Sequence, residues 1–337
     1  MRITVLAGGV GAARFLCGLK QAVPDAELTV VGNTGDDITL FGLRVCPDLD
    51  TVMYTLGGGI DQRQGWGRAD ETFSARAELA AYGASPDWFT LGDRDFATHI
   101  LRSQLLASGQ PLSAVTERLC RRWQPGVRLL PMSDDRVETH VVLQEDGGQR
   151  MVHFQEWWVR MRAETPAAAI IAVGAAEAVA APGVLEAIGD ADVILFPPSN
   201  PVVSIGTILA VPGIRAALTA KTVVAVSPII GGAPMASSTP GAGAARSAPT
   251  AMMSAAGTSA CRRTHHSWKC TVRRSSSTTC VSTGSSDIGS SRIPGCHRSQ
   301  STRVTADSGW PESSSWLRRM WVAKSRSPSV NQSGLAP

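Results

Sequence analysis

Apolar and polar positions near the start of the chain follow the order strand, helix, strand. Residues 2–8 form a short apolar run, residues 27–33 form another, and the segment between them has the spacing of an amphipathic helix. The same order returns later, where apolar runs at 192–200 and 221–232 flank a helical stretch. Strand-helix-strand units of this kind favour a parallel sheet.

The middle of the chain interrupts this pattern. Residues from about 71 to 124 have few strand signals and several amphipathic stretches, which predicts a mainly helical insertion. Residues 136–160 alternate like a hairpin that turns at Asp146-Gly147-Gly148. We therefore predict an α/β fold, a doubly wound, mostly parallel, Rossmann-like sheet with a helical insertion and a β-hairpin. In such sheets, ligands bind beyond the carboxyl ends of the strands.

The pattern stops after Pro234. Residues 235–337 contain 24 Ser but only 9 Leu, Ile, Val or Phe, too few apolar side chains to offset the entropy of ordering a core. This segment also holds 13 of the 32 Lys and Arg residues and only 3 of the 28 Asp and Glu residues. The net charge of +4 therefore belongs to the tail, and residues 1–234, which we take as one folded domain, are mildly acidic.

Three explanations for the tail compete: a basic nucleic-acid-binding extension, a natural disordered tail, and the product of a reading-frame shift. The first predicts clusters of Lys and Arg with aromatic residues between them, and such clusters are absent from the sequence. The sharp boundary and the loss of periodicity favour a frame-shift product. We expect residues 235–337 to be disordered and to lower the stability of the chain.

Overall composition fits a globular protein in the cytoplasm. Hydrophobic residues make up 43% and charged residues 18%, and the sequence has neither a run of about 18 apolar residues nor a signal peptide. None of the seven cysteines forms a CxxC pair, which disfavours a zinc ribbon or a redox dithiol. We expect small molecules as partners, with neither nucleic acid nor membrane, and leave a homodimer open.

The first strand runs into Gly8-Gly9-Val10-Gly11. Glycines between a strand and a helix allow backbone N–H groups and the helix N-terminus to approach a phosphate. The spacing does not meet the full dinucleotide fingerprint, which disfavours an NAD(P)-dependent dehydrogenase. A tight turn without a ligand is the other interpretation of this motif.

Carboxylates gather after the second strand. Asp36 and Asp37 follow that strand, Asp48 and Asp50 lie in the segment PDLD, and Asp61 follows three glycines. Oxygen ligands arranged beside a phosphate are typical of Mg²⁺ sites. A simpler alternative is that Asp48 or Asp50 caps the helix that begins there.

Two further segments bear on a ligand. The runs FPPSNPVVSIG and SPIIGG end neighbouring strands in small and hydroxyl-bearing residues, which forms a second anion-binding rim. Trp157 and Trp158 are adjacent and, in a strand, would point to opposite faces, so that one is free to stack on a flat ligand. The sequence has no nucleophile elbow and no P-loop, so we favour phosphoryl chemistry without a covalent nucleophile.

Together these segments resemble the 2-phospho-L-lactate transferase family of coenzyme F-420 biosynthesis, whose actinobacterial members are phosphoenolpyruvate transferases. The resemblance covers residues 1 to about 234 and rests on the motifs LAGGVGAARFLCGL, VGNTGDD, CPDLDTVMYTLGGGID, LGDRDFATHILRSQ, LLPMSDD, HFQEWWVR, PPSNPVVSIG and VSPIIGGAP. It implies transfer of a phosphoenolpyruvate or 2-phospho-L-lactate moiety from a guanosine diphosphate-linked donor to the deazaflavin Fo. GMP leaves, and (dehydro) coenzyme F-420-0 forms.

The resemblance also implies roles for individual residues. The expected Mg²⁺ ligands are Asp36, Asp48 and Asp50; the residues expected to bind Fo are Asp50, Thr90, Trp157 and Trp158; the residues expected to bind the diphosphate are Gly8, Gly9, Gly11, Ser199, Asn200 and Ser204. Asp50 is the expected catalytic residue if a general base is needed. A related nucleotide-sugar-binding regulatory protein without transfer activity is the main alternative.

Overall fold

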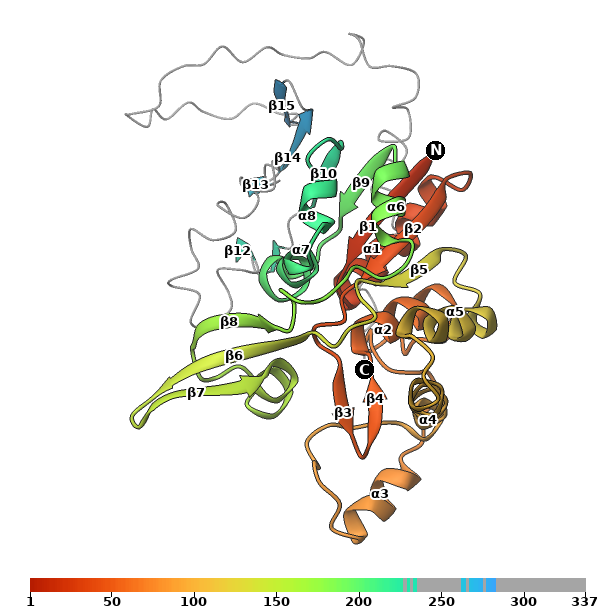
Figure 1. Ribbon diagram of the computed structural model, residues 1–337, viewed down its shortest axis with the longest axis vertical. Helices are drawn as coiled ribbons and strands as arrows, with labels where there is room; N and C mark the ends of the chain where they lie inside the picture. The colour runs from red at the N-terminus through yellow and green to blue at the C-terminus, as the bar shows by residue number, and fades with distance from the viewer. Residues whose placement is uncertain (227–228, 231–232, 235–261, 265–266, 275–276, 283–337) are drawn as a thin grey trace, which may run out of the picture.

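The chain folds around a central, mostly parallel sheet, seen in a computed structural model that describes residues 1–226, 229–230, 233–234, 262–264, 267–274 and 277–282 (Figure 1). Its five parallel strands, in spatial order, are β10 (Val223–Ala225), β9 (Val193–Phe196), β1 (Arg2–Ala7), β2 (Glu27–Gly32) and β5 (Arg128–Pro131). The chain runs from β1 outward to β2 on one side and later returns to β9 on the other. The order of the strands therefore reverses beside β1.

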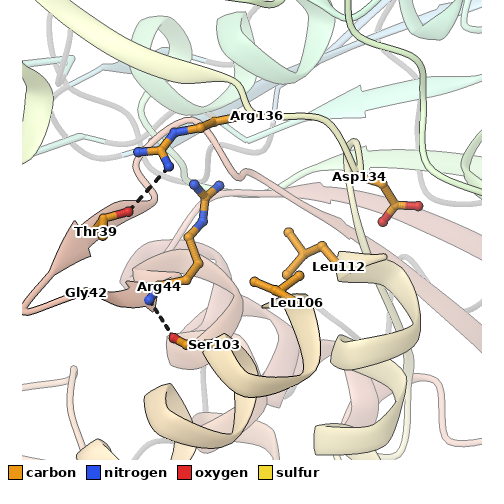
Figure 2. A pocket seen from close by; sticks show the side chains of 8 residues that line it. All are labelled: Thr39, Gly42, Arg44, Ser103, Leu106, Leu112, Asp134 and Arg136. Atoms are coloured by element: carbon orange, nitrogen blue, oxygen red, sulfur yellow. Dashed lines mark hydrogen bonds between the residues drawn. The ribbon is translucent and has the colours of Figure 1, made fainter. Parts of the chain in front are cut away.

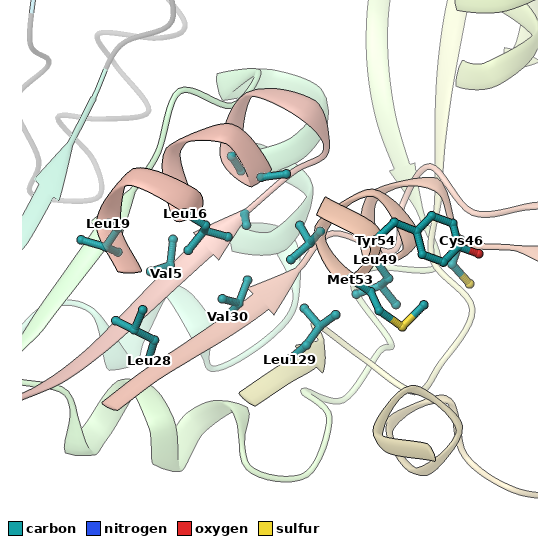
Figure 3. Close-up of a cluster of buried hydrophobic side chains, with 14 of the residues drawn as sticks. Val5, Leu16, Leu19, Leu28, Val30, Cys46, Leu49, Met53, Tyr54 and Leu129 are labelled. Carbon is teal, nitrogen blue, oxygen red and sulfur yellow. The ribbon is translucent and has the colours of Figure 1, made fainter. Parts of the chain in front are cut away.

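Helices cover both faces of this sheet. On one face lie α1 (Val10–Ala22), α2 (Pro47–Leu56) and α5 (Leu112–Trp123), and on the other lie α6 (Val184–Asp190), α7 (Thr207–Ala210) and α8 (Ile214–Ala217). The two faces arise because side chains alternate along each strand: Val5 of β1 packs under α1, and Leu6 packs toward the opposite helices. Figure 3 shows the first of these cores. The predicted doubly wound α/β fold is confirmed.

Further elements extend from the carboxyl edge of the central sheet (Figure 1). They are the hairpin β3 (Ile38–Leu40) and β4 (Leu43–Val45), the helices α3 (Ser74–Ala81) and α4 (Asp93–Ala107), and an antiparallel sheet in the order β7 (Gly148–His153), β6 (Glu138–Glu145) and β8 (Ala167–Val173). Residues 71–124 thus contribute three helices, of which α5 packs against the sheet itself.

The hairpin differs from the prediction at its end. Glu145 pairs with Gly148, so the turn lies where we expected it. The second strand, however, ends at His153, and residues Glu156–Arg160 form a wide helical turn, η1. Trp157 and Trp158 therefore lie on a helical turn rather than in a strand, and the expectation of opposite strand faces is wrong. Burial of Trp157 against Val203 outweighs the preference of tryptophan for strands.

Three strands lie in the segment that we expected to be a structureless tail. The strand β14 (Ser267–Arg274) pairs antiparallel with β10, and it is flanked by β13 (Arg262–Thr264) and β15 (Ser277–Ser282). The strands β11 (Ile229–Ile230) and β12 (Ala233–Pro234) pair with each other before it. The rest of the expected tail lies outside the described residues. No helix in the part of the chain that the structure describes is long and apolar enough to cross a membrane.

Candidate functional site

Three loops meet at the carboxyl edge of the central sheet because the strands β9, β1 and β2 are neighbours. They are the glycine loop 8–11 after β1, the acidic loop 33–37 after β2, and the loop 197–200 after β9. A crevice forms in open α/β sheets where the strand order reverses, and here that point lies between β1 and β9. The three loops thus surround the position at which open α/β sheets commonly bind ligands.

The glycine loop is packed so closely that side chains would not fit. The backbone N–H of Gly8 donates a 3.0 Å hydrogen bond to the hydroxyl of Ser199, which joins the loops after β1 and β9. A Cβ atom on Gly9 would lie 2.5 Å from Oδ1 of Asp48, and one on Gly11 would collide with the carbonyl oxygen of Pro198. The helix α1 begins at Val10, and its N-cap residue Gly9 has no side chain to cap it, so its first N–H groups are available to an anion.

The acidic loop and α2 meet at Asn33. The amide nitrogen of Asn33 donates a 2.9 Å hydrogen bond to Oδ2 of Asp48, and its amide oxygen accepts one of 2.9 Å from the backbone N–H of Gly35. Asp36, on the same loop, is buried close to Asp48 and Thr139, and its Oδ1 has no hydrogen-bond partner. Asp36 and Asp48, predicted to act together, are brought together by the fold.

Burial changes the protonation of these carboxyl groups. Loss of solvent raises the pKa of Asp48 to about 7, and loss of solvent together with the nearby Asp48 charge raises the pKa of Asp36 well above its ordinary value. Burial also raises the pKa of Asp37 to about 6, although Arg44 beside it acts in the opposite direction. No cationic side chain among the described residues pairs with Asp36 or Asp48, so their negative charge is uncompensated when both are ionised.

This pair fits a divalent cation that is shared with a ligand. Mg²⁺ commonly uses one or two carboxylates and completes its shell with water and substrate phosphates. The described residues contain no group of three His, Cys, Asp or Glu side chains that could hold a metal alone. The unpartnered oxygen of Asp36, the charge of the ionised pair and the uncapped start of α1 beside Asp48 are all features that a bound Mg²⁺-diphosphate would satisfy.

Asp50 lies apart from that pair. Both of its carboxylate oxygens accept hydrogen bonds from the guanidinium of Arg102, which is 1% exposed; the bond from Nη1 to Oδ2 measures 3.0 Å. The cap of α2 is Cys46, whose side chain makes no capping bond, so neither Asp48 nor Asp50 serves as the helix cap. The structure thus separates the three expected metal ligands into a pair and an arginine-bound carboxylate.

The two tryptophans differ in their availability. Trp157 is fully buried and its indole N–H donates a 2.7 Å hydrogen bond to the carbonyl of Thr165. Trp158 is 53% exposed, and its ring lies nearly parallel to that of Phe154, with the centroids 5.9 Å apart. Only Trp158 of this pair presents a ring surface to a ligand.

The remaining predicted residues occupy loop ends. Thr90 is partly buried in the segment just before α4. Asn200 caps the helical turn η2 (Pro201–Gly206), since its side-chain oxygen accepts from the N–H groups of Val202 and Val203. Ser204, on that turn, faces Gly8, because a Cβ atom on Gly8 would lie 2.5 Å from its hydroxyl oxygen. Ser199 and Ser204 therefore both lie against the glycine loop.

A separate cavity of about 290 Å³ lies between the β3–β4 hairpin, α4, the start of α5 and the segment 134–136 (Figure 2). It is lined by Thr39, Gly42, Arg44, Ser103, Leu106, Leu112, Asp134 and Arg136. Its polar groups are already engaged: Arg44 pairs with Asp37, Arg136 pairs with Glu138, and Asp134 accepts from both the N–H and the hydroxyl of Ser113. The cavity borders the candidate site through Arg44.

Two residues of the site escaped the sequence prediction. Asn33 follows the second strand directly, and its place beside the acidic loop was a usable signal. Arg102 shares a helical face with Thr98 and Leu105, which are also buried, so a charged residue at a core-facing position was the available sign.

Comparisons with known proteins identify the relatives of this chain. Residues 3–272 match the family described as 2-phospho-L-lactate transferase CofD. The phosphoenolpyruvate transferase of Streptomyces coelicolor is 71% identical over 237 residues, which cover 70% of this chain and 74% of that protein. The phosphoenolpyruvate transferase of Thermobifida fusca is 69% identical over 243 residues, covering 70% of this chain and 76% of that protein.

The enzyme of the same name from Streptomyces griseus is 72% identical over 237 residues, with 70% of this chain and 74% of that protein covered. Among solved structures, protein BH3568 from Bacillus halodurans is similar over 67% of each chain, at 19% identity and a TM-score of 0.47. The extent of the family match and the high identity to three relatives together show the family of this chain. The chain belongs to the 2-phospho-L-lactate transferase (CofD) family.

Proposed function

We propose that this chain transfers a phosphoenolpyruvate moiety, or a 2-phospho-L-lactate moiety, from a guanosine diphosphate-linked donor to the deazaflavin Fo. The observation that carries the proposal is the buried pair Asp36 and Asp48 beside the glycine loop, at the point where the strand order reverses. Membership of the family and the name shared by the relatives supply the reaction class.

The donor diphosphate would lie against the glycine loop. The free N–H groups at the start of α1 would donate to its oxygens, while Ser199 and Ser204 line the other side. Asp36 and Asp48 would hold Mg²⁺ in their ionised form. When bound, Mg²⁺ would neutralise charge on the diphosphate and on the departing GMP.

The acceptor hydroxyl of Fo would attack the phosphorus that bears the three-carbon acid. The new P–O bond forms as the bond to the GMP oxygen breaks, and the hydroxyl proton leaves to a base or to water. Asp50 and Thr90 would orient the acceptor, and the exposed ring of Trp158 would flank the flat deazaflavin. Positioning and charge neutralisation account for most of the rate in such transfers, so no covalent nucleophile is required.

The product of the reaction tests this proposal. The purified full-length chain is incubated with Fo, Mg²⁺ and each donor in turn, and the products are weighed by mass spectrometry. We expect GMP and an Fo ester of the three-carbon phosphate in equal amounts, with Asp48→Asn reducing the yield by about 100-fold or more. Binding of the donor without formation of either product would instead support a regulatory nucleotide-binding protein.

A further inference from the structure

Arg102 on α4 and Asp50 on α2 form a buried ion pair. The Arg102 guanidinium bonds both oxygens of Asp50, and Nη1 also donates to the carbonyl of Arg44 over 3.3 Å. A bidentate pair fixes the orientation of a carboxylate as well as its charge. Each oxygen of Asp50 still has a second lone pair with which to accept a further hydrogen bond.

The pair continues into a closed network between α2 and α4. Nη1 of Arg102 lies 3.1 Å from Nδ1 of His99, and Nε2 of His99 lies 3.5 Å from Oδ2 of Asp95. The hydroxyl of Tyr54 donates a 2.7 Å hydrogen bond to the other oxygen of Asp95. Asp50 and Tyr54 are four residues apart on α2, and Asp95, His99 and Arg102 share one face of α4, so the network links the two helices at both ends.

Stability alone is a weak explanation for such a network. A buried ion pair loses in desolvation much of what it gains in attraction, and well-packed apolar residues often stabilise as much. The network instead fixes Asp50, which lies two residues from Asp48 in the first turn of α2. It also anchors the start of α4, and Thr90 lies just before that start.

We propose that Arg102 is a positioning residue that holds Asp50, and through the His99–Asp95 arm the start of α4, in the orientation needed for the acceptor hydroxyl. This inference rests on the proposed function. It predicts that a disturbed network impairs use of the acceptor and spares the donor, because the glycine loop and the Asp36–Asp48 pair make no contact with Arg102 among the hydrogen bonds and ion pairs of the described residues.

Steady-state kinetics of Arg102→Lys and Arg102→Met, with Fo and the donor varied separately, test the inference. We expect kcat/KM for Fo to fall about 10- to 100-fold while KM for the donor changes less than about twofold. Arg102→Lys keeps the charge but loses the bidentate geometry. It should therefore fold better than Arg102→Met but still use the acceptor poorly. Arg121→Met, which removes an exposed pair with Glu117 on α5, is the matched control and should behave as wild type.

Tyr54→Phe extends the test if both Arg102 variants fail to fold. It removes only the hydroxyl that bonds Asp95, and we expect a smaller loss confined to kcat/KM for Fo. Wild-type kinetics in Arg102→Lys, or equal losses for donor and acceptor, would overturn the inference. If only Tyr54→Phe can be measured, wild-type kinetics in that variant would also overturn the inference. Absence of turnover in the wild-type chain would overturn the proposed function instead.

Discussion

Gly11 lies directly against the backbone carbonyl of Pro198. A Cβ atom at Gly11 would collide with that oxygen, which belongs to the loop after β9, whereas Gly11 itself is in the first turn of α1. The start of the helix and the loop of a neighbouring strand are thus in backbone contact. Glycine is therefore required at this position by the contact between the two loops, and not by the helix itself.

This contact predicts opposite effects for two glycines of the same helix. Gly11→Ala should lower the free energy of unfolding by about 1–3 kcal/mol, since a backbone atom blocks the new methyl group. Gly18→Ala should raise it by about 0.5–1 kcal/mol, because a Cβ atom there would meet no atom outside its own helix backbone within 4 Å and alanine favours helices. Urea denaturation of both variants measures the difference. Equal changes of the same sign would show that the loops are not in contact.

The side chain of Asn33 bonds both α2 and the acidic loop, so its loss should lower the stability of the chain. Asn33→Ala removes the bond to Asp48 and the bond to Gly35 at once, and leaves both partners buried. We expect the free energy of unfolding to fall by about 2–4 kcal/mol. Ser108→Ala, at the end of α4, removes one partly buried bond to a helix carbonyl and should cost about 1 kcal/mol or less. A loss for Asn33→Ala no larger than that of the control would contradict the proposed bridge.

The raised carboxyl pKa values predict a stability that falls as pH rises. The pKa is about 6 for Asp37, about 7 for Asp48 and well above the ordinary value for Asp36, whereas unfolded aspartates titrate near 3.9. Between about pH 4 and about pH 7 these three groups therefore bind more protons in the folded chain than in the unfolded chain, so their contribution to the free energy of unfolding falls as pH rises. Without Mg²⁺ we expect a loss on the order of 2–4 kcal/mol over this range.

Denaturation of the chain from about pH 4 to about pH 8, with Mg²⁺ and with a chelator, measures that loss. Mg²⁺ should restore stability most at the higher pH, where Asp36 and Asp48 are ionised. Asp48→Asn should have a flatter profile and a weaker response to Mg²⁺. A stability that rises over this range in the chelated chain would contradict the assignment.

Substitution of Trp157 should affect mainly the stability of the chain, whereas substitution of Trp158 should affect mainly the binding of Fo. Trp157→Ala empties a fully buried position and should cost about 3–5 kcal/mol. Trp158→Ala should change the free energy of unfolding by less than about 1 kcal/mol, since half of that side chain is exposed. If Trp158 flanks the deazaflavin, the same variant should weaken binding of Fo, measured by the anisotropy of its fluorescence, by about 5- to 10-fold. Unchanged affinity for Fo would remove Trp158 from the acceptor site.

More of the fold than of the candidate site could be predicted from the sequence. Apolar runs and helical spacing predicted the doubly wound sheet, because β1 and β2 are buried on both faces and read as continuous apolar segments. The meeting of Asp36 with Asp48 was also predictable, since both belong to the group of carboxylates between the second strand and the start of the next helix. The partner of Asp50 was not, because Arg102 lies 52 residues away and their contact depends on how α4 packs over α2.

Local pattern also failed at the tryptophans. The alternation that predicted a strand to residue 160 continued past His153, where the chain turns into η1 so that Trp157 can pack with Phe154 and Val203. Such a turn is decided by tertiary burial, which no short window of sequence records. The prediction of a frame-shift product after residue 234 stays a prediction, and translation of the gene's other two frames beyond that codon would test it.

The central claim is that Asp36 and Asp48 hold a metal ion against a diphosphate on the glycine loop. Crystals of the chain grown with GDP and Mn²⁺ test it most directly, through the anomalous signal of manganese. The account predicts one strong peak about 2.0–2.5 Å from carboxylate oxygens of both residues, with the diphosphate facing Gly8–Gly11. A peak at Asp50, or a diphosphate bound there with no metal at Asp36 and Asp48, would contradict it.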